Sequence, residues 1–177
     1  MPPSACNLAS WSASLPPSAH KVVVSDSGPL IALGRLDLLA LLPALFAQVQ
    51  VPQEVLIECL ARPANADAVR IQAAVAQGWL TPCTATPIAK PGLDSGERAA
   101  IARAQEIGAG LLADDLAARQ HGAALGLMVI GTLGVLVLGK RAGRLAAVKP
   151  LIERLRASGQ RLSQAAVADA LTAAQEA

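Results

Sequence analysis

The sequence predicts a single α/β domain, a three-layer sandwich with a mainly parallel central sheet flanked by helices. Short aliphatic runs of strand length alternate along the chain with longer helical patterns, which is typical of parallel sheets covered on both faces. Hydrophobic residues make up 53% of the chain but aromatic residues only 2%, so the core must be aliphatic. A length of 177 residues is enough for one domain with a full core.

The individual elements follow from periodicity and from turn residues. Strands are predicted over 21–25, 48–51, 110–113 and 127–130. Helices are predicted over 29–42, 52–60, 66–77, 94–107, 116–124, 132–140, 145–156 and 163–174. Pro29 suits the first turn of the first helix, and Asp94 with Glu97 has the spacing of a capping box. Residues 81–93 are rich in Pro and Thr and are predicted to form a loop.

The chain is predicted to have three parts. Residues 1–20, rich in Pro, Ser and Ala, form a disordered extension; they lack the charged and apolar regions of a signal peptide. Residues 21–157 form the domain, and 158–177 add a C-terminal helix for packing or for an oligomer contact. Residues 122–139 are uncharged and just long enough to span a membrane. Their five glycines and Thr132, placed to cap a helix, favour a buried strand, turn and helix, so no membrane is expected.

Charge and cysteine content narrow the function. The net charge of +2 does not by itself announce a polyanion partner. With so few aromatic side chains, a nucleic acid would be held through its phosphates and a metal rather than by base stacking. The three cysteines have no Cys-x-x-Cys spacing, so neither a disulfide framework nor a zinc knuckle is supported. A reducing cytoplasm suits them.

Carboxylates follow two of the predicted strands. Asp26 comes after the first, and Asp114 and Asp115 come after the strand at 110–113. Ligands of parallel sheets bind beyond the carboxyl ends of the strands, so these side chains are expected at one edge. Glu58 and Glu97 lie on helices that could begin at that edge.

A convergence of these carboxylates predicts a bound cation. Two unit charges about 4 Å apart repel by about 4 kcal/mol at an effective dielectric constant near 20. Ligands that are all oxygen select hard ions, so Mg²⁺ or Mn²⁺ is expected rather than zinc. Such ions favour phosphoryl chemistry. No serine or cysteine nucleophile with an adjacent base is apparent, which argues against acyl transfer.

Each acid also has a structural interpretation. Asp26 could bond the backbone of the turn before Pro29. One of Asp114 and Asp115 could cap the next helix; Asp114 is favoured as the ligand and Asp115 as the cap or a supporting residue. Glu97 could serve only in a capping box with Asp94.

Glu58 could be an ordinary surface residue, and Glu54, one turn earlier on the same helix, is its rival as a ligand.

Five segments of the chain together resemble PIN-domain proteins. They are VVVSDSGPLIALGRLDLL, VQVPQEVLIECL, LDSGERAAIARAQE, LLADDLAARQHGAALGLMVIGTLGVLVLGKRAG and VKPLIERLRASGQRLS. The resemblance runs from about residue 21 to 163, and the nearest subgroup is one long described as uncharacterised, with many members thought to be toxins of toxin–antitoxin pairs. Each motif is weak alone, and the combination is specific.

The resemblance implies a Rossmann-like sheet and Mg²⁺- or Mn²⁺-dependent cleavage of RNA. It places the metal-binding and catalytic acids on Asp26, Glu58, Glu97 and Asp114. Ser27 matches the small hydroxyl residue that commonly follows the first Asp. Many PIN nucleases carry Asp where this chain has Glu97, which leaves Glu97 and Asp94 as alternatives. The resemblance further implies a small antitoxin partner and homodimerisation.

Basic residues provide candidate contacts with the RNA backbone. Arg119 could hold a phosphate beside the metal, or it could pair with Asp115 across one helical turn. The densest basic cluster is a candidate phosphate track or, alternatively, a solvated helix end. That cluster consists of Lys140, Arg141, Arg144 and Lys149.

The function predicted is that of a cytoplasmic, metal-dependent endoribonuclease, the toxin of a toxin–antitoxin pair. The alternative is a non-catalytic module of the same fold that binds RNA or supports an assembly. A phospho-receiver domain is disfavoured because Gly131 and Thr132 follow the last strand where such domains place a Lys. A haloacid-type phosphatase is disfavoured because Gly28 occupies the position of its second Asp.

Overall fold

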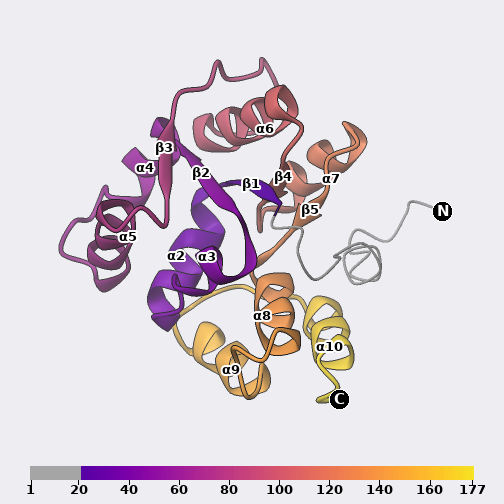
Figure 1. The fold of residues 1–177 in the computed structure, drawn as a ribbon. Coiled ribbons are helices and arrows are strands. Elements are labelled where there is room, and N and C mark those ends of the chain that lie inside the picture. The colour runs from indigo at the N-terminus through magenta and orange to yellow at the C-terminus, as the bar shows by residue number, and fades with distance from the viewer. Residues whose placement is uncertain (1–20) are drawn as a thin grey trace.

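A computed structural model describes residues 21–177 of the chain. The predicted extension, residues 1–20, lies outside the described residues. A five-stranded sheet forms the centre, with the strand order β3-β2-β1-β4-β5 and every pair parallel (Figure 1). The strands are β1 (Val22–Ser25), β2 (Gln48–Pro52), β3 (Thr81–Cys83), β4 (Gly110–Leu112) and β5 (Val129–Ile130). The predicted α/β architecture is therefore confirmed.

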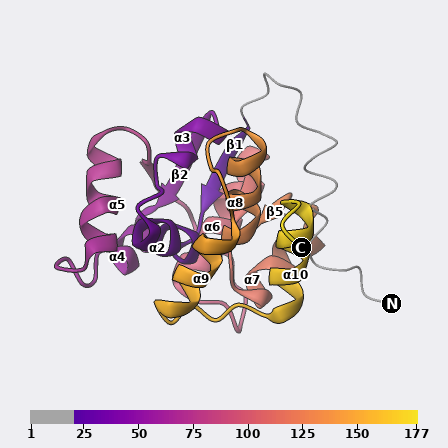
Figure 2. The same ribbon diagram turned by 90° about the horizontal axis from the view of Figure 1, so that it is seen from below.

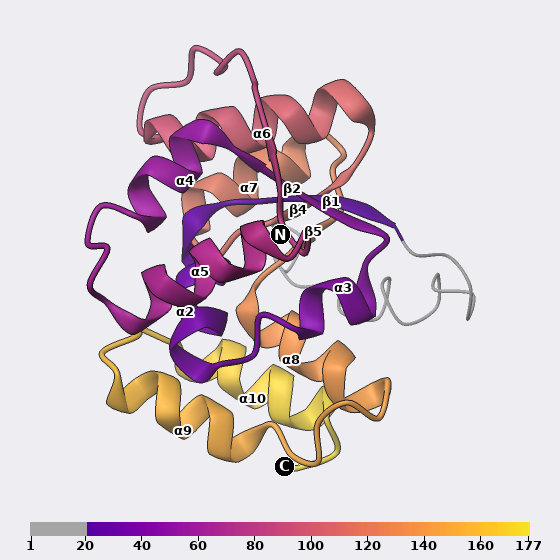
Figure 3. The same ribbon diagram turned by 60° about the vertical axis from the view of Figure 1, so that its left-hand side comes forward.

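Helices cover both faces of this sheet. They are α2 (Ser27–Leu36), α3 (Leu41–Leu45), α4 (Gln53–Cys59), α5 (Ala66–Ala76), α6 (Ser95–Ile107), α7 (Leu116–Ala124), α8 (Thr132–Arg141), α9 (Lys149–Ala157) and α10 (Gln164–Ala173). The helices α4, α6 and α7 lie on one side of the sheet, and α2, α3 and α8 lie on the other (Figure 3). The last two helices form an outer layer, with α9 against α2 and α10 against α8 (Figure 2). Val167 and Ala170 of α10 are buried, so the C-terminal helix packs on the domain.

Three predicted elements differ from the structure. The predicted loop 81–93 contains β3, an edge strand with Pro82 at its centre. The helix predicted over 29–42 is two helices, because the chain turns at Asp37, whose φ of 62° is left-handed. The helix predicted from 145 begins at Lys149. In contrast, residues 122–139 contain the end of α7, β5 and most of α8, as predicted.

No helix within residues 21–177 is both long and apolar enough to cross a lipid bilayer.

The alignment of β1 and β4 positions the candidate site. Ser25 at the end of β1 is in register with Leu112 at the end of β4. The backbone N–H of Asp26 donates to the Leu112 carbonyl at 2.9 Å, which extends this pairing by one residue. Asp26 and Asp114 therefore leave the sheet at the same edge, as the sequence predicts.

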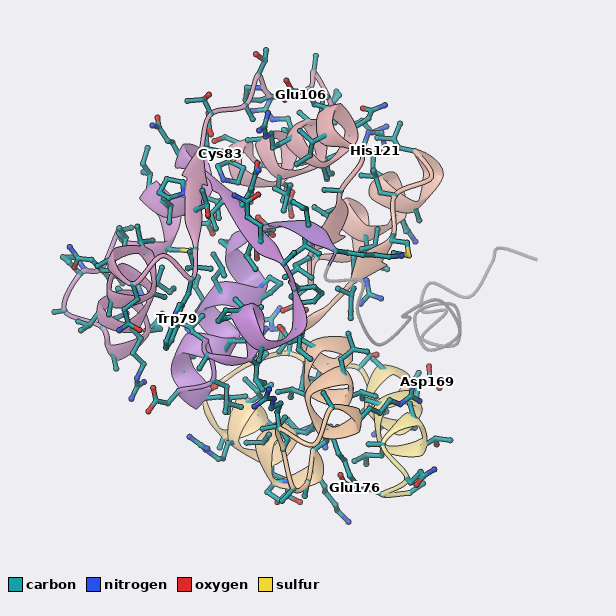
Figure 4. All side chains as sticks on the ribbon, viewed as in Figure 1. Trp79, Cys83, Glu106, His121, Asp169 and Glu176 are labelled. Atoms are coloured by element: carbon teal, nitrogen blue, oxygen red, sulfur yellow. The ribbon has the colours of Figure 1, made fainter. Side chains whose placement is uncertain are left out.

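The end of the chain is tied to α8 and α9 by one carboxylate. Glu176 Oε1 accepts from Lys140 Nζ at 2.6 Å and from the Val148 N–H at 2.7 Å, and Oε2 accepts from the Lys149 N–H at 2.9 Å. These bonds, first among them the one from Lys140, lower the pKa of Glu176 to about 2. Figure 4 shows Glu176 beside the last turn of α10. Glu176 therefore supplies the acceptor at the start of α9, where the first N–H groups have no partner within the helix.

Trp79 is a partly buried aromatic residue that packs against the core. It lines a cavity of about 200 Å³ between the turn after α2 and α5, together with Asp37 and Arg70, which form an ion pair at 3.0 Å. Figure 4 shows Trp79 on this side of the molecule, beside α5 and α2.

The same two helices approach each other closely at Gly34. A Cβ on Gly34 would lie 3.1 Å from Asp67 Cβ and 3.2 Å from Asp67 Cα, a backbone atom that cannot turn aside. Glycine is therefore required by the spacing of α2 and α5 rather than by its backbone conformation.

Replacing Gly34 with alanine is expected to destabilise the protein by about 1–3 kcal/mol, as overpacking of a core does. Urea unfolding followed by circular dichroism measures this change. The direction of the stability change distinguishes a crowded position from an open one, because alanine at an open helix position stabilises by roughly 1 kcal/mol relative to glycine. A gain in stability would show that α2 and α5 separate without cost.

Candidate acidic site

Asp26 is a buried carboxylate at the edge of the sheet. It is the N-cap residue of α2, but its side chain makes no capping bond. Its side chain is only 4% exposed, and Oδ1 has no hydrogen-bond partner. The pKa of Asp26 is raised to about 7, mainly by burial; a backbone bond at Ser27 opposes the shift, and the charges of Asp94, Glu97 and Glu58 add to it. Asp26 also bonds the backbone at Ser27, in the turn before Pro29, so its predicted role as a turn residue stands beside its predicted role as a ligand.

The three acids that act on Asp26 come from α4 and the start of α6. Asp94 Oδ1 accepts from the Glu97 N–H and Glu97 Oε2 accepts from the Asp94 N–H, both at 2.8 Å, which completes the predicted capping box. Glu97 is nevertheless buried, and this burial raises its pKa. Exposed Glu58 reaches the same place, since a Cβ on Gly96 would lie 3.4 Å from Glu58 Oε2.

Asp114 stands next to the first turn of α2. A Cβ on Gly28 would lie 3.3 Å from Asp114 Cβ, so a larger residue there would crowd the carboxylate. Both of its oxygens bind Thr132: Oδ1 accepts from the backbone N–H at 2.7 Å and Oδ2 accepts from Oγ1 at 2.6 Å. Burial raises the pKa of Asp114, while the two Thr132 bonds and the charge of Arg119 oppose that effect. Asp114 thus fixes the start of α8.

The contact between Thr132 and an acidic side chain is not predicted by the sequence. The prediction that Thr132 caps a helix is wrong, because Gly131 is the N-cap of α8 and no side chain caps it. The buried side chain of Thr132 instead orients Asp114. The available signal was Gly131 before it. A Cβ on Gly131 would lie 2.9 Å from Asp114 Oδ1 and 3.2 Å from Arg119 Nη1, so no side chain fits between the strand end and these groups.

Two of the remaining acids have distinct positions. Asp115 is exposed and caps α7, accepting from the N–H groups of Ala117 and Ala118 at 2.7 and 3.0 Å, which confirms its predicted capping role. Glu54 lies on the side of α4 that faces β3. There burial raises the pKa of Cys83, and the negative charge of Glu54 adds to the shift. Glu54 is not among the charges that act on Asp26, so the electrostatics favour Glu58 over Glu54.

The basic candidates divide between two ends of α8. Arg119 lies at the acidic end, where its charge acts on Asp114. Lys140 and Arg141 lie at the other end, about 14 Å away at the rise of an α-helix. There the Lys140 ammonium bonds the Ala174 carbonyl at 2.7 Å as well as Glu176, and Arg141 Nη2 bonds the Ala173 carbonyl at 3.0 Å.

These bonds show that Lys140 and Arg141 hold the end of α10, a use that the sequence did not predict. Arg144 and Lys149 are exposed near the same end of the helix.

The acids fit a cation electrostatically, although they do not enclose one. In the part of the chain from residue 21 onward, no three His, Cys, Asp or Glu side chains form a group that could hold a metal ion. Asp26 Oδ1 is nevertheless a buried acceptor without a donor, and Asp94, Glu97 and Glu58 place further negative charge on it. Oxygen atoms alone would select Mg²⁺ or Mn²⁺. A divalent ion would relieve the repulsion that burial leaves uncompensated.

The comparisons with known proteins agree with this geometry. The family model DUF3368, described as a PIN domain, matches residues 22–176, which is nearly all of the described chain. None of the curated proteins compared with the chain matches it. The match includes α10, beyond the residues in which the sequence alone resembles PIN domains. PIN domains are generally nucleases. On the extent of the match and the all-parallel sheet, this chain belongs to the PIN-domain family.

Proposed function

We propose that this protein is a divalent-metal-dependent endoribonuclease whose acidic site is centred on Asp26. The observation that carries the proposal is the state of that carboxylate. It is buried, one oxygen has no donor, and three other acids raise its pKa. A purely structural carboxylate would be expected to bond the N–H groups that it could cap, as Asp115 does.

The residues of the site have separable roles in this proposal. Asp26 would hold the cation directly, and Glu58 and Glu97 would hold it directly or through water. When bound, Mg²⁺ or Mn²⁺ would supply a nucleophilic water and neutralise charge on the scissile phosphate. Asp94 positions Glu97 through the capping box, and buried Ser27 follows Asp26 into the first turn of α2.

Asp114 would complete the site from the neighbouring strand. Thr132 fixes its carboxylate by two bonds, which leaves the second lone pair of each oxygen as a possible ligand. Arg119 beside it would hold a phosphate through its planar guanidinium group. Exposed Arg144 and Lys149 would contact the RNA backbone farther away.

The proposed partners follow from the nuclease activity. A ribonuclease in the cytoplasm requires an inhibitor, and a small antitoxin covering the acidic site would serve. Apolar residues are exposed near that site: Ile57, adjacent to Glu58 on α4, is 72% exposed, and Leu116 at the start of α7 is 60% exposed. Such residues favour a protein contact, with the antitoxin or with a second copy of the chain.

The test is cleavage of structured and unstructured RNA by the purified protein, with and without Mn²⁺. Cleavage is expected only with the metal, and Asp26→Ala and Asp114→Ala are each expected to abolish it. Glu153→Ala serves as the matched control because it removes an exposed carboxylate from α9 and no carboxylate of the site.

Cleavage that survives both site substitutions or persists in EDTA would contradict the proposal. RNA binding without any cleavage would favour the non-catalytic module, in which Asp114 serves only to hold Thr132.

A further inference from the structure

A cavity of about 270 Å³ lies beside Asp114, and its other lining residues come from α7, the start of α8, the loop before α10 and α10. Its inner wall is formed by Asp114, Arg119 and the first turn of α8. Its outer wall is formed by Arg161 and Leu162 of the loop before α10, and by α10 itself. Figures 1 and 2 show α8 and α10 side by side, in agreement with their contacts.

The lining of this cavity combines an apolar surface with two cations. Leu116, Leu133 and Leu162 supply aliphatic surface, and Arg119 and Arg161 supply guanidinium groups. Asp114 and Asp169 of α10, the latter labelled in Figure 4, add two carboxylates, so the lining holds as many acidic as basic side chains. A mixed lining of this kind does not match a simple inorganic anion. It matches a ligand that has an anionic part and a flat, largely apolar part with polar edges.

The size of the cavity limits that ligand. Pockets for drug-sized molecules measure about 300–1,000 Å³, so this cavity lies just below that range and suits a ligand no larger than a single nucleotide. The cavity has no aromatic side chain among its lining residues, and a base inside it would contact leucines and the plane of a guanidinium group.

We infer that this cavity binds a single nucleotide of a single-stranded RNA, with the base against the leucines and its phosphate at Arg119 and Arg161. The inference rests on the proposed function and names the part of the substrate that lies next to Asp114. It gives the C-terminal segment a role in RNA binding, because Arg161, Leu162 and Asp169 all come from residues 158–177. A double helix would keep its bases stacked and could not place one in the cavity.

Two substitutions with matched controls test the cavity. Arg161→Ala removes a cation from its wall, and Arg156→Ala removes an exposed cation from α9 that does not line it. Leu116→Ala removes exposed apolar surface from the wall, and Leu125→Ala removes similar surface from the other end of α7. All four side chains are exposed enough for the variants to fold.

The measurement is fluorescence anisotropy of a short, unstructured, labelled RNA with the full-length protein in EDTA, so that binding is separated from cleavage. Arg161→Ala is expected to weaken binding about tenfold, as loss of a hydrogen bond to a charged group does. It should also reduce the slope of log K against log [salt] by about 0.7, the value for one phosphate contact with a single strand. Leu116→Ala is expected to weaken binding several-fold without changing the slope. The two controls should behave as wild type.

Competition identifies the bound group. AMP is expected to displace the RNA better than ribose 5-phosphate, and ribose 5-phosphate better than inorganic phosphate. Equal competition by inorganic phosphate and AMP would overturn the inference and leave a simple anion site. Binding that is unchanged in Arg161→Ala and Leu116→Ala would also overturn it. If Leu116→Ala instead lowers the mass measured by light scattering while RNA binding is unchanged, the cavity is a contact with a second copy of the chain.

The inference and the proposed function can fail separately. The protein could bind RNA through the cavity and yet fail to cleave RNA with Mn²⁺. That result would contradict the proposed nuclease activity and support the nucleotide pocket. Normal cleavage in all cavity variants would instead support the nuclease and overturn the nucleotide pocket.

Discussion

Asp26→Asn is expected to make the metal-free protein more stable at pH 8 by up to about 4 kcal/mol while it abolishes cleavage. The stability gain follows from the pKa of about 7, because ionising this buried carboxylate above that pH costs free energy that an amide does not. The loss of activity is expected to be roughly 10²- to 10³-fold or more, since a catalytic metal contributes several kcal/mol to the transition state. Thermal unfolding in EDTA and RNA cleavage with Mn²⁺ measure the two effects.

The opposite signs of these effects make the experiment specific. Glu153→Gln on exposed α9 changes the net charge by the same amount and should alter neither quantity. A structural carboxylate would behave differently, with stability and activity falling together. An Asp26→Asn protein less stable than wild type at pH 8 would contradict the assignment of Asp26 as an uncompensated buried charge.

The free energy of unfolding of the metal-free protein is expected to fall as the pH rises from about 4 to about 7. Asp26 has a pKa of 3.8 when unfolded and of about 7 when folded, so the folded state binds more protons between these values. Stability must then decrease with rising pH across that window. Burial shifts the pKa of Glu97 and of Asp114 in the same direction.

Below about pH 4, the free energy of unfolding is expected to fall as the pH falls. The pKa of Glu176 is lowered from 4.5 to about 2, so its bonds to Lys140 and α9 are lost as the pH falls through that interval. Urea unfolding at a series of pH values should therefore show a maximum in the free energy of unfolding near about pH 4. Most proteins are most stable at a higher pH, between about 5 and 8. In Asp26→Asn the decline toward neutral pH should be much shallower.

Adding Mn²⁺ at pH 8 should restore the stability that the carboxylates lose. A ligand that binds only the folded state stabilises it by about 2.7 kcal/mol at a hundred times its dissociation constant. The increase should be absent in Asp26→Asn. An equal increase in both proteins would place the bound metal elsewhere.

The parts of the site that the sequence predicts are those set by local rules. Asp26 and Asp114 share an edge because Asp26 directly follows β1 and Asp114 comes one residue after the end of the parallel strand β4. The capping box of Asp94 and Glu97 and the cap at Asp115 depend only on spacing within one helical turn. The capping box joins Asp94 and Glu97 but does not decide which of the two would bind a metal.

The parts that the sequence does not predict depend on distant contacts. Thr132 binds Asp114 across 18 residues, and Lys140 binds Glu176 across 36, and neither pairing leaves a periodic signal. The edge strand β3 was missed because it is three residues long and contains Pro82. Proline is tolerated in a sheet at an edge, but it argues against a strand in the sequence. The end of α2 is not predicted because the residue with left-handed backbone there is Asp37 and not a glycine.

The scarcity of aromatic residues gives the protein a simple optical signature. The chain has no tyrosine and two tryptophans. Trp79 follows α5 and lines a cavity with residues of the turn after α2, while Trp11 lies outside the described residues. With Trp11 replaced by phenylalanine, the fluorescence would come from one indole beside the Asp37–Arg70 pair. That emission would report on the surroundings of Trp79 alone, because no second indole would contribute to it.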